Sequence, residues 1–225
     1  MKRITVLLAE DHQIVREGFR CLLRHEHDIE VIGEAETGRQ AVQLTRKLRP
    51  AVVVMDIAMP SLNGLEATRQ IRKDSPGTRV LILSAHSDDA YVAQVTALGA
   101  AGFLLKQTSS HSLATAIREV QKGNTFYSPA VSRRLQDPSQ KAMDREGHVR
   151  KKNNRLSSRE VEVLQLIAEG KPNKQVAAEL RVSFKTVDKH RQHLMSKLNI
   201  HDIAGLTRYA IAEGIIESTV RVNIT

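Results

Sequence analysis

The sequence predicts a two-domain protein of the α/β class, with a doubly wound parallel sheet of five strands followed by a separate all-α domain of four helices. Two observations predict this division. Residues 1–124 contain five short apolar runs separated by segments with helical spacing, which is typical of a parallel sheet covered by helices on both faces. Residues 155–219 show helical spacing alone.

The strand-like runs of the first domain are short and almost uninterrupted by polar residues. Between them, apolar residues recur three or four positions apart, as in Ala41, Leu44 and Leu48, which is the spacing of a helix that buries one face. The alternation therefore indicates repeated strand–helix units. The five predicted strands lie at Val6–Ala9, Val31–Ala35, Val52–Met55, Val80–Leu83 and Phe103–Leu105.

The apolar pattern fades after the first domain, and residues 125–154 are predicted to form a short helix followed by a linker. Pro129, Pro138 and Gly147 interrupt this stretch, and residues 141–152 are rich in charge. Such a composition supplies no core and is typical of connecting segments. Residues 220–225 are predicted to be a short C-terminal tail.

The second domain opens with a helix-capping signal, because Ser157 is followed three residues later by Glu160 and Gly170 ends the helix. A short helix, a tight turn and a longer helix follow. This arrangement is a helix-turn-helix, whose second helix enters the major groove of DNA. The remaining predicted helices are Asn173–Leu180, a helix from the cap Ser183 to about Asn199, and Ile203–Glu213, which is closed by Gly214.

Length, composition and charge restrict the function classes. No apolar run among the 225 residues approaches the roughly 20 that a membrane span needs, so we expect an unexported, cytoplasmic protein without membrane contact. The single cysteine, Cys21, has apolar neighbours and is expected to be buried. Residues 1–124 carry 16 basic and 14 acidic side chains, whereas residues 125–225 carry 18 and 11. The basic excess of the second part favours a nucleic-acid partner.

Charged and polar side chains gather where the predicted strands end, and ligands bind at this edge of a doubly wound sheet. Carboxylates that meet there repel one another unless a cation lies between them, and oxygen ligands suit Mg²⁺. A hydroxyl and an ammonium group complete a site for a phosphoryl group, with Asp56 as the nucleophile that forms an aspartyl phosphate. The strand-end side chains are Glu10, Asp11, Asp56, Ser84 and Lys106.

The segments around these residues resemble the CheY-like receiver domain of two-component response regulators. They are LLAEDH (7–12), VVVMDIAMPSLNGLE (52–66), VLILSAH (80–86) and GAAGFLLK (99–106). The resemblance covers residues 1 to about 124 and implies the flavodoxin-like strand order 2-1-3-4-5. It implies Asp56 as the phosphoacceptor, a Mg²⁺ site made by Glu10, Asp11, Asp56 and the main-chain carbonyl of Ala58, and a switch made by Ser84, Phe103 and Lys106.

The same resemblance implies a sensor histidine kinase as the source of the phosphoryl group. The protein would assist its own modification without being a turnover enzyme. Ala58 offers no side-chain group to position an attacking water, so we expect slow self-dephosphorylation. Phe103 is expected to rotate inward when Asp56 is phosphorylated.

The segment 156–200 resembles the LuxR-type helix-turn-helix of the NarL/FixJ class of response regulators, and the match extends to near Ile216. The third helix carries a polar stripe opposite Val187 and Leu194, because residues three and four positions apart share a helix face. Lysine and glutamine there can read base edges, and neighbouring side chains can hold phosphates of double-stranded DNA. The candidate DNA contacts are Lys174, Ser183, Lys185, Thr186, Asp188, Lys189, Arg191 and Gln192.

Two of these positions depart from the family pattern. Asp188 stands where the family often has lysine, and it either accepts from a cytosine amino group or takes no part in base reading. Arg191 replaces a more common aliphatic residue.

One recognition helix covers few base pairs, so specific binding predicts a homodimer on an inverted repeat. The resemblance implies dimerisation through the fourth helix, although the same side chains would serve equally as core. They are Ile203, Leu206 and Tyr209.

These observations predict a bacterial response regulator in which phosphorylation of Asp56 controls dimerisation and sequence-specific DNA binding, with RNA polymerase as a further candidate partner. The alternative is a constitutively active DNA-binding regulator with an uncoupled receiver. A haloacid-dehalogenase-type phosphatase would need an aspartate in place of Ala58. A quorum-sensing regulator would need an aromatic-lined pocket, for which 3% aromatic residues and no tryptophan offer little material.

Overall fold

The computed structural model describes residues 3–85, 89–107, 110–128, 131 and 156–216. The chain divides into two compact units, Met1–Lys151 and Lys152–Thr225. Most of the predicted linker, residues 125–154, lies outside the described residues, as do the short helix expected within it and the tail 220–225.

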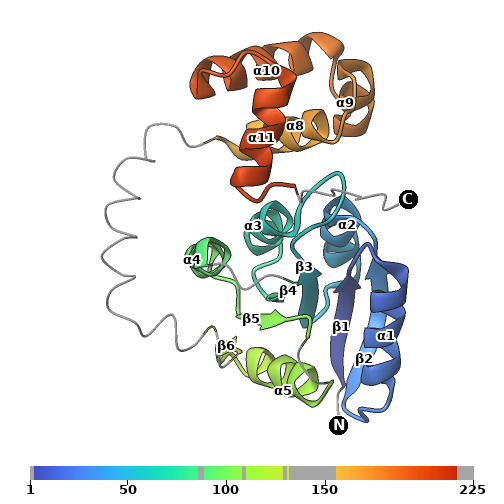
Figure 1. Ribbon diagram of the computed structural model, residues 1–225. Coiled ribbons are helices and arrows are strands. Elements are labelled where there is room, and N and C mark those ends of the chain that lie inside the picture. Colours follow the sequence, from blue (N-terminus) through green and yellow to red (C-terminus); the bar gives the residue numbers. More distant parts are fainter. Residues whose placement is uncertain (1–2, 86–88, 108–109, 129–130, 132–155, 217–225) are drawn as a thin grey trace, which may run out of the picture. The chain divides into compact units, whose positions relative to one another are not determined.

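The first unit is built on a parallel sheet with the strand order β2-β1-β3-β4-β5-β6 (Figure 1). The doubly wound parallel architecture is thereby confirmed. The strands are β1 Ile4–Ala9, β2 Ile29–Ala35, β3 Val52–Asp56, β4 Arg79–Ser84, β5 Gly102–Leu105 and β6 Phe126–Tyr127; the helices are α1 Gln13–Arg24, α2 Gly38–Leu48, α3 Gly64–Asp74, α4 Asp89–Leu98 and α5 Ser110–Gln121.

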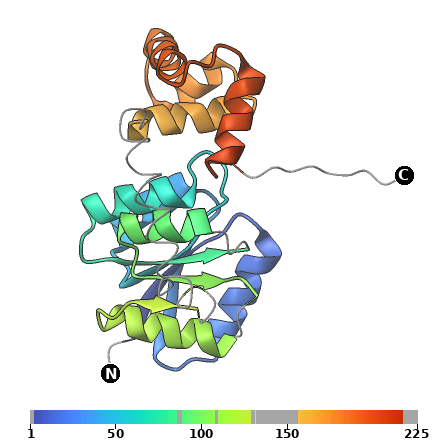
Figure 2. The same ribbon diagram turned by 60° about the vertical axis from the view of Figure 1, so that its left-hand side comes forward.

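Both faces of the sheet are covered, which explains why its strands are apolar throughout. Alternate residues of each strand point to opposite faces, so β3 buries Val53 against α2, α3 and α4 and buries Val54 against α1 and α5. Figures 1 and 2 show α1 and α5 on one side of the sheet and the other three helices on the opposite side. Every residue of β3 is buried.

The predicted count of five strands is wrong by one. Residues Phe126–Tyr127, expected within the linker, form β6 and pair in parallel with β5 at the edge of the sheet. The amide of Phe126 donates to the carbonyl of Ala101 over 3.0 Å, and the amide of Ser128 donates to the carbonyl of Phe103 over 3.0 Å. A two-residue strand is too short to show a period of two, so the hydrophobic pattern does not reveal it.

The expectation that Cys21 is buried is also wrong, because its side chain is exposed. Helix α1 turns Arg16, Phe19 and Leu23 toward the sheet, and these positions are three and four residues apart. Cys21 lies two positions from both Phe19 and Leu23, which places it on the outward face of the helix.

The second unit is a helical domain of the predicted kind. Its helices are α8 Ser158–Ala168, α9 Asn173–Leu180, α10 Phe184–Leu198 and α11 Ile203–Ala212. Ser157 and Glu160 form the predicted capping box, and the side chain of Ser183 accepts the amide of Thr186 at the start of α10. One core, with Leu164, Val187 and Leu194 at its centre, joins the helices.

Candidate functional site

The acidic cluster lies at the carboxyl edge of the first unit's sheet. Strands β1, β3, β4 and β5 are consecutive neighbours there, so Glu10, Asp56 and Ser84 are brought to the same edge. All three are buried, with at most 3% of each residue exposed. The ammonium group of Lys106 joins two of the predicted carboxylates. Its Nζ lies 2.8 Å from Glu10 Oε2 and 3.0 Å from Asp56 Oδ1.

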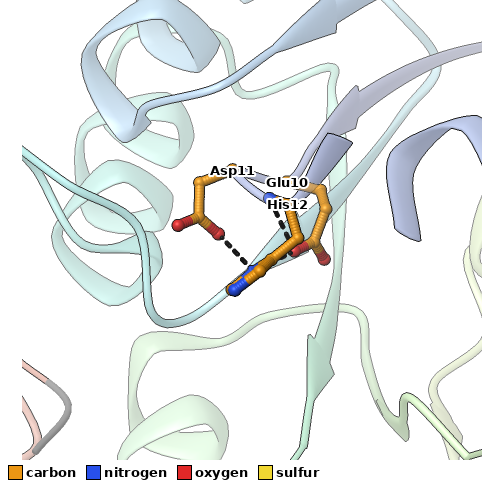
Figure 3. A group of neighbouring side chains, drawn as sticks. All are labelled: Glu10, Asp11 and His12. Carbon is orange, nitrogen blue, oxygen red and sulfur yellow. Dashed lines mark hydrogen bonds and ion pairs between the residues drawn. The ribbon is translucent and has the colours of Figure 1, made fainter. Parts of the chain in front are cut away.

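The side chains of Glu10, Asp11 and His12 converge within this cluster (Figure 3). His12 Nδ1 lies 2.9 Å from Asp11 Oδ1 and 3.1 Å from Glu10 Oε1. The charge of Asp11 is the main reason that the pKa of His12 is raised above its ordinary value. Sequence reasoning missed His12 as a member of this cluster, and its position directly after the acidic pair was the available signal.

Burial dominates the protonation of Asp56. Removal of the carboxyl from water and the nearby charge of Glu10 together raise the pKa of Asp56 to about 7, although Lys106 acts in the opposite direction. Burial lowers the pKa of Lys106, but the charges of Asp56 and Glu10 outweigh this and hold it above its ordinary value. The site therefore concentrates negative charge for which Lys106 compensates only in part.

The donor set fits a hard divalent cation. Among the described residues, three buried carboxylate oxygens of this cluster have no hydrogen-bond donor: Glu10 Oε2, Asp11 Oδ1 and Asp56 Oδ2. The first two have only ion-pair contacts, with Lys106 and His12. A buried oxygen without a hydrogen bond, such as Asp56 Oδ2, is costly, and carboxylate oxygens are the ligands that Mg²⁺ prefers.

The loop after β3 is held close to Asp56. The amide of Ile57 donates to Asp56 Oδ1 over 2.9 Å, and the amide of Gly64 donates to the carbonyl of Ile57 over 2.8 Å. A Cβ at Gly64 would lie 1.8 Å from the carbonyl oxygen of Asp56, so only glycine permits this approach. The loop that begins with Ile57 and contains Ala58 therefore folds back tightly beside the carboxylate.

Buried Arg16 binds the main chain of the acidic pair, and sequence reasoning missed this residue. Arg16 Nη1 donates to the carbonyl of Glu10 over 2.6 Å, while its other nitrogens reach Glu34 Oε2 at 3.1 Å and Glu36 Oε1 at 2.8 Å. Arg16 thus joins α1 to the ends of β1 and β2. No local spacing rule identifies such a residue, because its partners lie at the ends of two different strands.

The predicted switch residues lie on the neighbouring strands β4 and β5 or directly after β5. The main-chain amide of Lys106 donates to the carbonyl of Ser84 over 2.8 Å, which ties β5 to β4 at the site. Phe103 is fully buried in the core between the sheet and helices α2 to α4. An inward rotation is therefore not needed to bury this ring.

The second candidate site is the outer surface of α10. Lys185, Lys189 and Gln192 are exposed, whereas Val187 and Leu194 on the opposite face are buried. This arrangement matches the polar stripe expected from the helical spacing. Gln192 Nε2 donates to Asp188 Oδ2 over 3.1 Å, so two of the predicted DNA contacts are already joined to each other.

The other predicted DNA contacts lie at the start of α10, in the middle of α10 and on α9. Ser183 Oγ accepts the amide of Thr186 and lies 2.8 Å from Thr186 Oγ1. Arg191 Nη1 donates to Asn173 Oδ1 over 3.2 Å, which links α10 to α9, and Lys174 is exposed beside that contact. Sequence reasoning missed one exposed residue on this surface, Phe184, because the search there was for polar side chains.

The three residues considered for dimerisation differ in accessibility. Ile203 is 51% exposed, whereas Leu206 is fully buried in the core of the second unit. Tyr209 is partly buried and packs against the same core. Within one chain, Leu206 therefore serves as a core residue, and of the three Ile203 is the most accessible to a partner.

Comparison with known proteins assigns both units. Residues 6–118 match the response regulator receiver domain, and residues 154–210 match the bacterial regulatory proteins of the luxR family. The chain belongs to the two-component response regulators that join a receiver to a LuxR-type DNA-binding domain, and it is a transcriptional regulator. Such proteins are not generally regarded as turnover enzymes, and receiver domains typically use Mg²⁺ at their phosphorylation site.

Particular relatives extend over nearly the whole chain. Transcriptional regulatory protein DegU of Brevibacillus brevis is 36% identical over 211 residues, covering 89% of both proteins. LiaR of Bacillus subtilis is 37% identical and covers 92% of this chain and 96% of its own. Among solved structures, RcsB of Salmonella typhimurium is 29% identical with a TM-score of 0.61, covering 95% of this chain and 99% of its own.

A further RcsB structure is described as two dimers bound to two parallel DNAs. It has a TM-score of 0.56 at 29% identity and covers 92% of this chain and 98% of its own.

Within the described part of this chain, no helix has the length and apolar character required to cross a membrane.

Proposed function

We propose that Asp56 accepts a phosphoryl group from a sensor histidine kinase and that this modification controls dimerisation and DNA binding by the second unit. The main support for the proposal is the position of Asp56 at the carboxyl end of β3, in the middle of the sheet. Its carboxylate is buried, lies 3.0 Å from Lys106 Nζ and retains one oxygen without a hydrogen bond. This is the arrangement that phosphoryl transfer to a carboxylate requires, since positioning and charge compensation supply most of the catalysis.

In the proposed transfer, an Asp56 oxygen attacks the phosphorus of a phosphohistidine on the kinase. The new O–P bond forms as the N–P bond breaks, and the histidine nitrogen leaves with the bonding electrons. Lys106 Nζ follows the negative charge from the Asp56 carboxylate to the phosphoryl oxygens. Glu10, Asp11, Asp56 and the carbonyl of Ala58 would hold Mg²⁺, which when bound offsets charge on the phosphoryl group.

The signal then passes through the neighbouring strand ends. Ser84 follows the new phosphoryl charge with its hydroxyl, and Phe103, which packs beneath helices α2 to α4, transmits the shift to that face of the sheet. We propose that this altered face releases or pairs the DNA-binding units, so that two copies bind an inverted repeat. Binding beside RNA polymerase would then change transcription.

The aspartyl phosphate is expected to persist, because Ala58 has no side-chain group to orient water toward phosphorus. A lifetime of minutes or longer follows from this reading. A lifetime of seconds at neutral pH, measured by loss of the phosphorylated species on a phosphate-affinity gel, would contradict it.

For the DNA-binding unit, we propose that Lys185, Lys189 and Gln192 face base edges. Lys174, Ser183, Thr186 and Arg191 hold phosphates, and Asp188 either accepts from cytosine or orients Gln192, to which it is already hydrogen-bonded. The exposed positions of the two lysines and of Gln192 support this division.

The proposal is tested by incubating the full chain with Mg²⁺ and a small acyl phosphate, followed by mass spectrometry. We expect one added phosphoryl group, none in the Asp56→Asn variant, and normal modification of Asp74→Asn, which changes a carboxylate that pairs with Arg46 away from the site. Modification that survives Asp56→Asn would move the phosphoacceptor elsewhere and contradict the assignment.

A further inference from the structure

Helix α10 carries a large apolar side chain where its surface is otherwise polar. Phe184 is the first residue of the helix and is 58% exposed. Burial of an aromatic ring against an apolar group is favourable, so a ring on a recognition surface points to an apolar group on the partner. The inference below rests on the proposed DNA-binding role of α10.

The position of Phe184 is rigidly defined. Ser183 caps the helix by accepting the amide of Thr186 over 3.1 Å, and the buried Val187 anchors the first turn in the core. The Cβ of Phe184 is therefore held by well-ordered helix geometry. Its ring is therefore presented on the surface of the helix.

Phe184 lies on the same stripe as the proposed base-reading residues. Asp188 and Gln192 follow it at intervals of four, which places all three side chains on one face, and Lys185 and Lys189 flank them. The N-terminal residues of a recognition helix are those that contact base edges. The two flanking lysines favour a phosphate-bearing partner over an apolar protein surface.

The major groove offers one apolar group that matches this ring. Thymine presents its C5 methyl there, while the other natural bases present donors and acceptors. We propose that Phe184 contacts the C5 methyl of one thymine in each half-site and thereby determines specificity at that base pair. A 5-methylcytosine at the same position presents the same methyl group and would be accepted in the same contact.

The test removes a single methyl group from the DNA. An operator is first selected from random duplexes with the full chain in Mg²⁺ and beryllofluoride, the phosphoryl mimic. Each thymine is then replaced in turn by deoxyuridine, which keeps the Watson–Crick edge. For the wild type we expect one position per half-site where this replacement weakens binding about fourfold, because the burial of one methyl group is lost. Replacement in both half-sites should weaken binding about 15-fold.

Variants of the protein assign the effect to the ring. Phe184→Ala should bind thymine and deoxyuridine operators equally, and Phe184→Leu should retain part of the preference. Ile211→Ala, which truncates another exposed apolar side chain of the same unit, should keep the full wild-type preference. Because each preference is a ratio within one variant, a general loss of affinity does not imitate the expected result.

Three outcomes overturn the inference. If no thymine position discriminates in the wild type, or if Phe184→Ala discriminates as strongly, Phe184 does not contact a methyl group although DNA binding itself stands. If no sequence is enriched from the random pool, the proposed DNA-binding role fails and the inference fails with it.

Discussion

At the scale of single residues, the burial of Asp56 determines its chemistry. A carboxylate that has lost water and lies beside Glu10 is unstable as an anion, which raises the pKa of Asp56 to about 7. The same instability favours any process that spreads or offsets this charge. Cation binding and phosphoryl transfer are both processes of that kind.

This burial predicts that Asp56→Asn stabilises the metal-free protein in a pH-dependent way. A carboxyl whose pKa is raised by folding contributes stability at low pH that is lost as pH rises through the folded pKa, here about 7. The free energy of unfolding of the variant should therefore exceed that of the wild type by about 2 to 4 kcal/mol at pH 8 and by far less at pH 4.

Hydrogen exchange of the β3 amides, in full-length protein with a chelator present, measures this difference. Adding Mg²⁺ at pH 8 should reduce the difference in unfolding free energy between variant and wild type, because the cation compensates the charge of Asp56 only in the wild type. A difference of equal size at both pH values would show that the substitution does not act through the charge.

Single residues also show what the sequence could predict about the site. Glu10, Asp56, Ser84 and Lys106 were predictable because each ends or directly follows an apolar strand, and parallel strands end at one edge. Arg16 was not, since its partners come from other strands and only the folded chain brings them together.

At the scale of elements, one glutamate joins two helices of the DNA-binding unit. Glu160 completes the capping box of α8, where its Oε2 accepts the amide of Ser157 over 2.7 Å, and it also lies 3.0 Å from Lys197 Nζ on α10. Burial raises the pKa of Glu160, but the hydrogen bonds from Ser157 and Lys197 outweigh this and leave the pKa below its ordinary value.

Glu160→Gln should therefore lower the stability of the second unit by about 1 kcal/mol at neutral pH. Because folding lowers the pKa of Glu160, its stabilisation is present above the ordinary value of 4.5 and is lost as pH falls through the lower folded value. The variant should lack this part of the acid dependence. Hydrogen exchange of the α8 and α10 amides measures both effects.

A second carboxylate provides a matched control for this change. Glu179→Gln removes one of the two carboxylates that pair with Lys171, the other being Glu169, without touching a helix cap, and it should cost less. If Glu179→Gln costs as much as Glu160→Gln, or if Glu160→Gln leaves the acid dependence unchanged, the cap and the link to α10 do not stabilise the unit as described.

Elements were predictable where local chemistry marks their ends. The start of α8 after Ser157 and of α10 after Ser183 follow from capping side chains, and the structure shows both caps. The strand β6 has no such signal, because two residues at a sheet edge acquire their pairing only from the neighbouring strand β5.

In the whole molecule, the receiver and the DNA-binding domain are two separate compact units. The phosphoacceptor candidate lies in the first unit and the recognition helix in the second. We propose that a charge change at Asp56 controls DNA binding by α10. Because this control links the two units, the decisive experiment uses the full chain.

The measurement is selection from random duplex DNA with the full-length protein in Mg²⁺, with and without beryllofluoride as a phosphoryl mimic, beside the Asp56→Asn variant. We expect an inverted repeat to be enriched with the mimic, weakly or not at all without it, and not by the variant. Equal enrichment of the same sequence in every arm would contradict control by Asp56 and show a DNA-binding protein uncoupled from its receiver.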